Sequence, residues 1–243
     1  MKSNKTIVLE CYRKIIRDLD LSVIDQYIHD DYIQHSPSVK NGKAGIVEML
    51  MFLKTLPKPT VQQVSPIIRL IAEGDYVAIH LNVAFMGKHI VVIDMYRLQN
   101  GKLAEHWDAS EGQTITNEGL ITMTNGSSVI EDSADAEANK NLITGFYEEV
   151  LKPKNLKYID KWLTPGFIEH DMKKGILVCN NQIKKIHKMI AEGNFVLTHS
   201  EYMEGETAFA NFDLFKLEDD KIAEHWSVSQ QVPSTMAHGN GMF

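Results

Sequence analysis

The feature that most constrains this chain of 243 residues is an internal repeat. Residues 32–35 (Tyr-Ile-Gln-His) recur as residues 167–170 (Phe-Ile-Glu-His), an offset of 135 residues. Residues 94–107 recur, less closely, as residues 213–226, an offset of 119 residues. The second copy is therefore collinear with the first but 16 residues shorter, the difference between the offsets. A repeat of this length indicates two copies of one folding unit.

The repeat predicts two domains of common ancestry. We place the first at residues 1–113 and the second, shortened domain at residues 139–230. Residues 114–138 between them are rich in Ser, Thr, Asn, Gly and acidic side chains, which is typical of an irregular linker. Residues 231–243 form an irregular C-terminal tail that ends in two apolar residues, so it either packs against a domain or stays loose.

Within the first copy the apolar spacing changes along the chain. Three stretches have the spacing of helices, and they are residues 6–18, 21–28 and 42–56. Four stretches with period-two alternation follow, and they are residues 61–72, 76–86, 90–98 and 103–111. Helices first and an antiparallel meander afterwards indicate an α+β fold in each copy.

Composition narrows the class of partner. The net charge of −7 and the pI near 5.8 argue against nucleic acid, since phosphate binding needs a basic surface. Two cysteines make neither a disulfide framework nor a four-ligand zinc site. No apolar run reaches the roughly 20 residues of a membrane span, and the N-terminus lacks the apolar core of a signal peptide. We therefore expect a cytoplasmic protein with no membrane partner.

The helix-first layout, residues 32–37 and the hairpin of residues 94–108 resemble the SnoaL-like, or polyketide cyclase-like, branch of the NTF2-like superfamily. The resemblance covers both copies and implies two tandem cones, each a curved antiparallel sheet wrapped around N-terminal helices, with a pocket for a small-molecule ligand. Family members commonly pair sheet to sheet, so the two copies are expected to form a pseudo-dimer within one chain. A homodimer of whole chains stays open. No cofactor is implied.

The register of the hairpin decides which side chains share the pocket. Asn100-Gly101 is a strong hairpin signal. A two-residue turn would put Asp94 on the face away from Asp108, whereas a three-residue loop with Gly101 in a G1 bulge would put both on one face. We predict the bulged register, because it gathers Asp94, Tyr96, His106 and Asp108.

Two carboxylates, an imidazole and a phenol on one surface favour acid–base chemistry. A carboxylate desolvated in an apolar cone, next to a second carboxylate, has a raised pKa and suits a base that removes a proton beside a carbonyl. The resemblance implies that Asp108 matches the base of the polyketide cyclases. We name Asp108, Asp94 and His106 as catalytic candidates. Asp108 as a mere hydrogen-bonded strand residue, and His106 as a residue that serves the fold, remain open.

Four further residues are candidates for substrate binding: Tyr12, Tyr32, His35 and Tyr96. Tyr32 and His35 begin the loop at the expected pocket mouth, and the alternatives are loop packing for His35 and core packing for Tyr12. No metal is expected, since no two-His helical spacing or Cys/His cluster is present. The second copy has Ser227 where the first has Asp108, so we expect it to be degenerate and kept for scaffolding.

These observations leave three hypotheses of different classes. The first is an aldol-cyclase- or isomerase-type enzyme that acts on a small, apolar carbonyl compound with Asp108 as base. The second is a non-catalytic module that binds a small molecule, and the third is a protein-interaction domain with filled cones.

Overall fold

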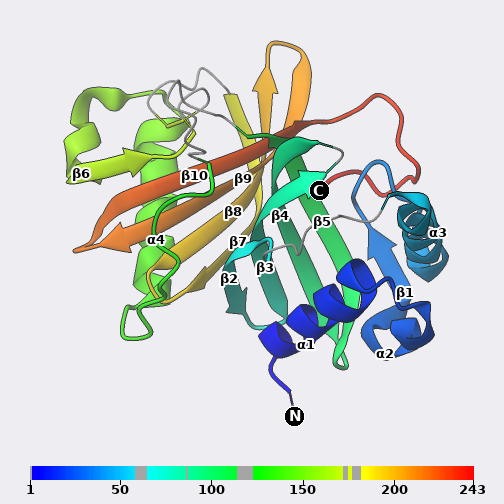
Figure 1. Cartoon of the computed structure of the whole chain (residues 1–243). Helices are drawn as coiled ribbons and strands as arrows, with labels where there is room; N and C mark the ends of the chain where they lie inside the picture. The colour runs from blue at the N-terminus through cyan, green and yellow to red at the C-terminus, as the bar shows by residue number, and fades with distance from the viewer. Residues whose placement is uncertain (1, 58–64, 86, 114–122, 172–174, 177–181) are drawn as a thin grey trace. The chain divides into compact units, whose positions relative to one another are not determined.

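The computed structural model describes the chain except for residues 1, 58–64, 86, 114–122, 172–174 and 177–181. Each half of the chain begins with helical segments and continues into a five-stranded sheet (Figure 1). The α+β prediction is therefore confirmed for both copies. Part of one expected strand, residues 61–64, lies outside the described residues, and the strand that follows begins at Ile67.

The elements of the first half are α1 (Asn4–Cys11), η1 (Tyr12–Arg17), η2 (Leu21–Val23), α2 (Ile24–Tyr27), β1 (Ile28–Gln34), α3 (Gly42–Thr55), β2 (Ile67–Glu73), β3 (Tyr76–Phe85), β4 (Lys88–Gln99) and β5 (Lys102–Gly112). Those of the second half are α4 (Ala136–Phe146), η3 (Tyr147–Leu151), η4 (Leu156–Lys161), β6 (Leu163–Glu169), β7 (Gln182–Glu192), β8 (Phe195–Glu204), β9 (Thr207–Glu218) and β10 (Lys221–Gln231). Among the described residues of the second half, no helix corresponds to α3, in keeping with the shorter second copy.

The two sheets have the same topology. The strand orders are β1-β5-β4-β3-β2 and β6-β10-β9-β8-β7. In each sheet the first strand runs parallel to the last, with Gln34 paired to His106 and Glu169 paired to His225. From the sequence, residues 31–35 are expected only to lead into a loop, so these parallel edge strands were not predicted. They matter because they carry the partners of both central histidines.

The first helix of each half ends in the same irregularity. Serine and aspartate side chains cap the starts of α1 and α4, since Ser3 accepts from Thr6 N–H and Asp135 accepts from the N–H groups of Glu137 and Ala138. Each helix then widens into a π-helical turn, and this turn begins at Tyr12 in one copy and at the matching Tyr147 in the other. Such turns often occur at functional sites.

The described chain divides into two compact units. Unit 1 contains residues 1–79, 94–108 and 233–243, and unit 2 contains residues 80–93 and 109–232. The C-terminal tail therefore belongs to unit 1, although it follows the last strand of the second sheet. The domain boundaries expected from the sequence describe ancestry rather than contacts, and they stay a prediction.

In unit 2, the buried face of α4 and η3 packs on the second sheet. The shared cluster includes Ile143, Phe146, Val196, Phe215 and Ile222.

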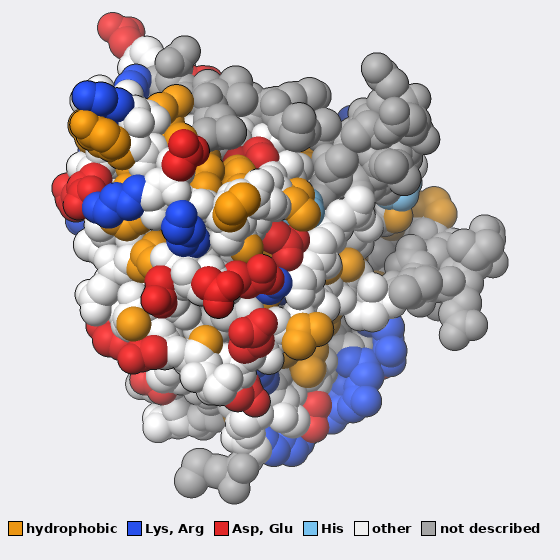
Figure 2. All heavy atoms as spheres, turned by 90° about the vertical axis from the view of Figure 1, so that its left-hand side faces the viewer, with side chains coloured by type: hydrophobic (Ala, Val, Ile, Leu, Met, Phe, Trp, Pro, Cys, Tyr) orange, Lys and Arg blue, Asp and Glu red, His pale blue; other side chains and the backbone are white. Residues whose placement is uncertain are grey.

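On the face of the molecule in Figure 2, acidic, basic and apolar side chains are interspersed, as on a solvated surface. Among the described helices, none has both the length and the apolar character needed to cross a membrane.

Candidate functional site

The turn of the first hairpin differs from the prediction. Strand β4 ends at Gln99, β5 begins at Lys102, and both residues between them have positive φ, +52° at Asn100 and +74° at Gly101. This is a two-residue turn with both central residues left-handed, so the expected G1 bulge at Gly101 is wrong.

The shared face nevertheless exists, and the second hairpin indicates how it can form. In the second hairpin the pairing shifts between Ile222 and Glu224, which leaves Ala223 as the extra residue. Its match in the first hairpin is Ala104, 119 residues earlier. A bulge there changes which side chains face one another. The structure thus brings Asp94, His106 and Asp108 together without the predicted bulge at Gly101, and the second hairpin points to a bulge at Ala104 instead.

Asp94, His106 and Asp108 form the centre of the site. One ligand-type atom from each of the three side chains lies within 4.8 Å of the other two. Asp94 and His106 are buried, and Asp108 is half-buried. Two carboxylates and an imidazole at this spacing could hold either a proton or a divalent cation.

Asp94 is held by two neighbours. The Tyr12 hydroxyl donates to Oδ2 at 2.7 Å, and His106 Nε2 lies 3.1 Å from Oδ1. Tyr12 comes from the π-helical turn and His106 from β5, so the carboxylate ties the helical layer to the sheet. With both oxygens engaged, Asp94 is suited to orienting His106 rather than to accepting a proton from a ligand.

The contacts of His106 define its protonation. Gln34 Oε1 accepts the Ser36 N–H at 2.9 Å and also lies 2.9 Å from His106 Nδ1. Nδ1 must therefore donate, and the contact from Nε2 to Asp94 needs a second proton. Burial alone would lower the pKa of His106, but the hydrogen bond and charge of Asp94, with the charge of Asp108, raise it above the ordinary value. The result is an imidazolium paired with Asp94.

Asp108 has the opposite character. Ser36 Oγ donates to its Oδ2 at 3.1 Å, whereas its Oδ1 is buried and has no hydrogen-bond partner among the described residues. Burial raises the pKa of Asp108 and the Asp94 charge adds to this, outweighing the opposing effects of His106, Ser36 and His238. Asp108 is therefore the carboxylate of the pair that is available as a base.

Three tyrosines surround this centre. The Tyr96 ring stacks on His106 with centroids 4.6 Å apart. Burial, followed by the charge of Asp94, raises the pKa of Tyr12 and Tyr96 well above the ordinary value. Burial is also the largest cause for Tyr32, whose pKa is raised by Cys11, Asp94 and Asp108 as well. The phenols stay protonated and can donate hydrogen bonds.

His35 lies on the other face of the hairpin. Its ring stacks on Trp107 at 4.9 Å, Nε2 is 3.0 Å from Glu105 Oε1, and Nδ1 donates to the Gly241 carbonyl at 3.0 Å. Trp107 and Glu105 alternate with His106 along β5, so this face points away from Asp94 and Asp108. The site therefore does not include His35, but it does contain the other candidates Tyr12, Tyr32 and Tyr96.

The C-terminal tail contacts the loop that supplies the partners of the site. His238 Nε2 donates to the Ser36 carbonyl at 2.8 Å, and Asn240 Nδ2 donates to the Gln34 carbonyl at 2.9 Å. Ala237 N–H donates to the Pro37 carbonyl at 2.8 Å, and Met242 is buried. The tail is therefore packed against this loop. Of the two alternatives for the tail, packed or loose, the packed one is confirmed.

Gln34 and Ser36 are functional residues that reasoning from the sequence missed. The repeat held the signal, because Gln34 is matched by Glu169, a side chain that can also accept a hydrogen bond. Position 34 keeps a hydrogen-bond acceptor in both copies although the residue type changes. That shared acceptor would have indicated a partner for His106.

Comparison with known proteins places this site in a family. Residues 6–118 match the family described as SnoaL-like polyketide cyclase. Residues 6–118 thus form a SnoaL-like domain. The second sheet repeats the same NTF2-like α+β topology, as a tandem repeat requires. No curated protein matches the chain.

Solved structures are similar over about half of the chain. They include TsrD from Streptomyces laurentii (16% identity, 46% of this chain and 90% of that one, TM-score 0.35). A SnoaL-like polyketide cyclase from Agrobacterium tumefaciens (15%, 46% and 93%, 0.36) and a steroid delta-isomerase from Pseudomonas aeruginosa (19%, 49% and 85%, 0.36) are similar too. At these identities and TM-scores they say nothing about what this chain binds or converts.

Proposed function

We propose that the SnoaL-like domain is an acid–base enzyme that acts on a small, largely apolar carbonyl compound, with Asp108 as the base. The observation that carries the proposal is the contrast between the two carboxylates. Both carboxylate oxygens of Asp94 are hydrogen-bonded, one to Tyr12 and one to His106. Oδ1 of Asp108, in contrast, is buried and has no hydrogen-bond partner among the described residues. Its raised pKa makes it a stronger base than an ordinary aspartate.

The reaction begins with transfer of a proton from the carbon beside the carbonyl to Oδ1 of Asp108. The electron pair left on that carbon delocalises onto the carbonyl oxygen and gives an enolate. The neutral phenol of Tyr96 or Tyr32 donates a hydrogen bond to this oxygen. In a ring closure, the enolate carbon attacks a second carbonyl, whose π electrons move onto its oxygen, and this alkoxide takes the proton back from Asp108. In an isomerisation, Asp108 returns the proton to another carbon instead.

His106 supports this step without taking part in the proton transfer. Its imidazolium lies between Gln34 and Asp94, so its charge sits beside Asp108 and favours the ionised, proton-accepting form of that carboxylate. The same bridging position recurs at His225, which accounts for the histidine in both copies.

The test is exchange of the α-protons of enolisable β-keto esters and cyclic ketones for deuterium in D₂O, followed by NMR. We expect Asp108→Asn to lower the exchange rate by about 10²–10⁴-fold, the usual contribution of a general base. Thermal stability should stay the same or rise, because a buried carboxylate with a raised pKa costs folding free energy at neutral pH. Asp31→Asn, on an exposed carboxylate of the same unit, is the matched control.

A non-catalytic binding module is the second candidate, and the full engagement of Asp94 and His106 in internal hydrogen bonds favours it. Equal exchange rates in wild type and Asp108→Asn, together with unchanged retention of a bound ketone, would support binding alone. Dialysis against a chelator separates either candidate from a metal-assisted reaction, since the Asp94, His106 and Asp108 set could hold a divalent ion.

A further inference from the structure

The second copy keeps a carboxylate at the place where the first copy has a serine. Ser36 is matched by Asp171 at the first offset, and Asp108 is matched by Ser227 at the second. Serine and aspartate have therefore exchanged positions between the loop and the strand. The loss of Asp108 from the second copy is not a loss of its carboxylate, which has moved to the facing segment.

Local geometry confirms that Ser36 and Asp171 are equivalent. The N–H of Ser36 donates to the Gln34 side chain at 2.9 Å, and the N–H of Asp171 donates to the Glu169 side chain at 3.1 Å. One residue earlier, His35 N–H donates to the His106 carbonyl and His170 N–H to the His225 carbonyl, each at 2.9 Å. The two loops leave their edge strands with the same backbone hydrogen bonds.

The inner face of the second sheet, which we define as the face contacted by Tyr147 of η3, has polar residues at positions where the first sheet has apolar ones. Directly paired residues share a face, and two such rows are Thr198–Asp213–Ser227 and Ser200–Asn211–Ser229. At the offset of 119 residues, Thr198, Ser200 and Asn211 replace Ile79, Leu81 and Val92. A domain kept only as a scaffold would gain nothing from these changes, because buried polar groups cost free energy unless they are hydrogen-bonded.

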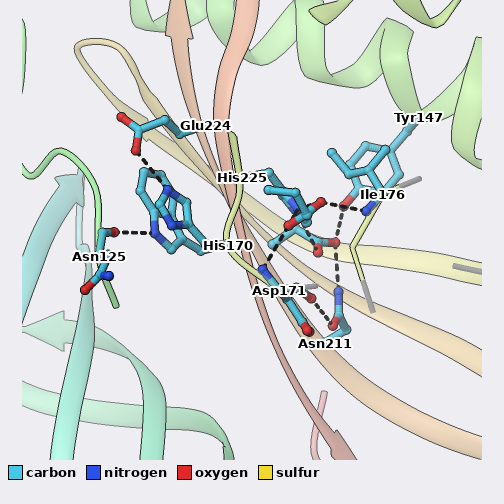
Figure 3. Close-up of polar contacts among 12 residues, drawn as sticks. Asn125, Tyr147, His170, Asp171, Ile176, Asn211, Glu224 and His225 are labelled. Atoms are coloured by element: carbon cyan, nitrogen blue, oxygen red, sulfur yellow. Dashed lines mark hydrogen bonds and ion pairs between the residues drawn. The ribbon is translucent and has the colours of Figure 1, made fainter. Parts of the chain in front are cut away.

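Some of these polar side chains form hydrogen bonds with one another. Asn211 Nδ2 donates to Asp213 Oδ2 at 2.8 Å, and Ser227 Oγ donates to Asn211 Oδ1 at 3.0 Å. Figure 3 shows the side chain of Asp171 pointing from its loop toward Asn211. Two partners therefore fix the orientation of the amide while the carboxylate approaches it.

Ser200 adds a hydroxyl to this set. It is 1% exposed and lies directly opposite Asn211 on the neighbouring strand. A ligand hydroxyl beside Asn211 would therefore also lie near the hydroxyl of Ser200.

We propose that the inner face of the second sheet is a second binding site, in which Ser200, Asn211, Ser227 and Asp171 hydrogen-bond a small polyhydroxylated molecule. The site is independent of the function proposed for the first copy. Its aspartate accepts hydrogen bonds from ligand hydroxyls, and the amide and serine side chains supply both donors and acceptors. The first site, with apolar residues at three of these positions, selects a different class of molecule.

The layer beneath this site favours binding over proton transfer. His225 Nδ1 lies 2.9 Å from Glu169 Oε1, and Nε2 lies 3.0 Å from Asp213 Oδ1. Tyr147 also donates to Asp213 at 2.7 Å (Figure 3). With a carboxylate at each nitrogen, the imidazolium is held in one position. It is therefore a fixed positive charge next to the ligand rather than a group that exchanges protons with it.

The experiment is protein-observed ¹H–¹⁵N NMR on the full chain, titrated with 1,3,5-trihydroxybenzene. The matched control probe is 1,3,5-trimethoxybenzene, which has the same ring but no hydroxyl donor. We expect saturable shifts at the Asn211 side-chain amide and at Ser227 with the first probe only. Ser200→Leu, which restores the residue of the first copy, should weaken binding by at least about tenfold, or roughly 1.4 kcal/mol.

Asp171→Asn keeps the shape of the site if Ser200→Leu disturbs packing, and it should weaken binding in the same way. Asp108→Asn should leave the titration unchanged, so failure of the first site and failure of the second are distinguishable. The proposal is overturned if the hydroxylated probe shifts no resonance of the second sheet. Equal shifts with the methoxy probe, or binding that neither Ser200→Leu nor Asp171→Asn weakens, would overturn it too.

Discussion

In the first copy a histidine lies between a neutral amide and a carboxylate, and in the second it lies between two carboxylates. Gln34 and Asp94 flank His106, whereas Glu169 and Asp213 flank His225. Opposed by burial, the Glu169 charge and the Asp213 hydrogen bond raise the pKa of His225 to about 10. One change from amide to carboxylate therefore separates a site whose charges can respond to a ligand from one whose charges are fixed.

The neighbouring aspartates follow the same division. Burial would raise the pKa of Asp213, but hydrogen bonds from His225, Tyr147 and Asn211 lower it below the ordinary value. Asp108, with one serine partner, has its pKa raised by burial. The comparison teaches that a buried carboxylate is a base only where the surrounding donors leave it one free oxygen.

Replacing the histidines gives the sharpest test of this comparison. His225→Leu leaves the buried Asp213 and the half-buried Glu169 without their shared cation, and we expect it to destabilise the chain by about 3–5 kcal/mol. His106→Leu leaves one carboxylate, Asp94, without its cation but with the hydrogen bond from Tyr12, so its cost should be about 1–3 kcal/mol. Urea unfolding of the two variants measures the difference. Equal losses would contradict the assignment of unequal charges.

The pH dependence of stability follows from the raised pKa of His225. The stabilisation is fully present below the ordinary value of 6.5 and is lost as the pH rises through about 10. We expect the free energy of unfolding, followed by thermal melting, to fall by on the order of a few kcal/mol across this pH window. In Glu169→Gln, which imitates Gln34, the folded-state pKa of His225 is lower, so the loss should be smaller and complete at lower pH. A melting temperature that stays constant up to pH 10 would show that His225 is not held as an imidazolium.

Deletion of the tail tests whether the first site depends on it. Without residues 233–243, the carbonyls of Gln34 and Ser36 lose Asn240 and His238, and Met242 no longer packs. We expect a loss of about 1–3 kcal/mol in stability and roughly tenfold in exchange rate through misplacement of Ser36. Met236→Ala, which keeps these hydrogen bonds, is the control. A truncated chain as active as wild type would remove the tail from the site.

The smallest expected effect is that of Ser36→Ala on the acid limb of the exchange rate. The Ser36 hydrogen bond lowers the pKa of Asp108, so its loss should move the limb to higher pH, with Asp108 ionising later. Ser38→Ala, an exposed serine of the same loop, should not move it. A limb that moves down, or not at all, would mean that Asp108 is not the titrating base.

The sequence predicted the repeat, the α+β order and the residues of the central cluster, because period-two alternation and paired offsets are visible in one chain. It did not locate the bulge, since the side chains of the hairpin could be gathered by an extra residue at Gly101 or beyond it. It also placed His35 in the pocket. The stacking on Trp107 that turns His35 to the other face depends on a parallel edge strand that residues 31–35 do not reveal.

The path of the tail has a practical consequence for dissecting the chain. Residues 233–243 follow the second sheet in sequence but belong to the compact unit of the first. In the second copy the corresponding contact comes from the linker, where the Asn125 carbonyl accepts from Trp226 and the Ser127 N–H approaches Glu224. A gene fragment cut at residue 113 would therefore lack part of its own unit, so an inactive fragment would say nothing about Asp108. Grafting the last eleven codons onto that fragment restores the missing segment.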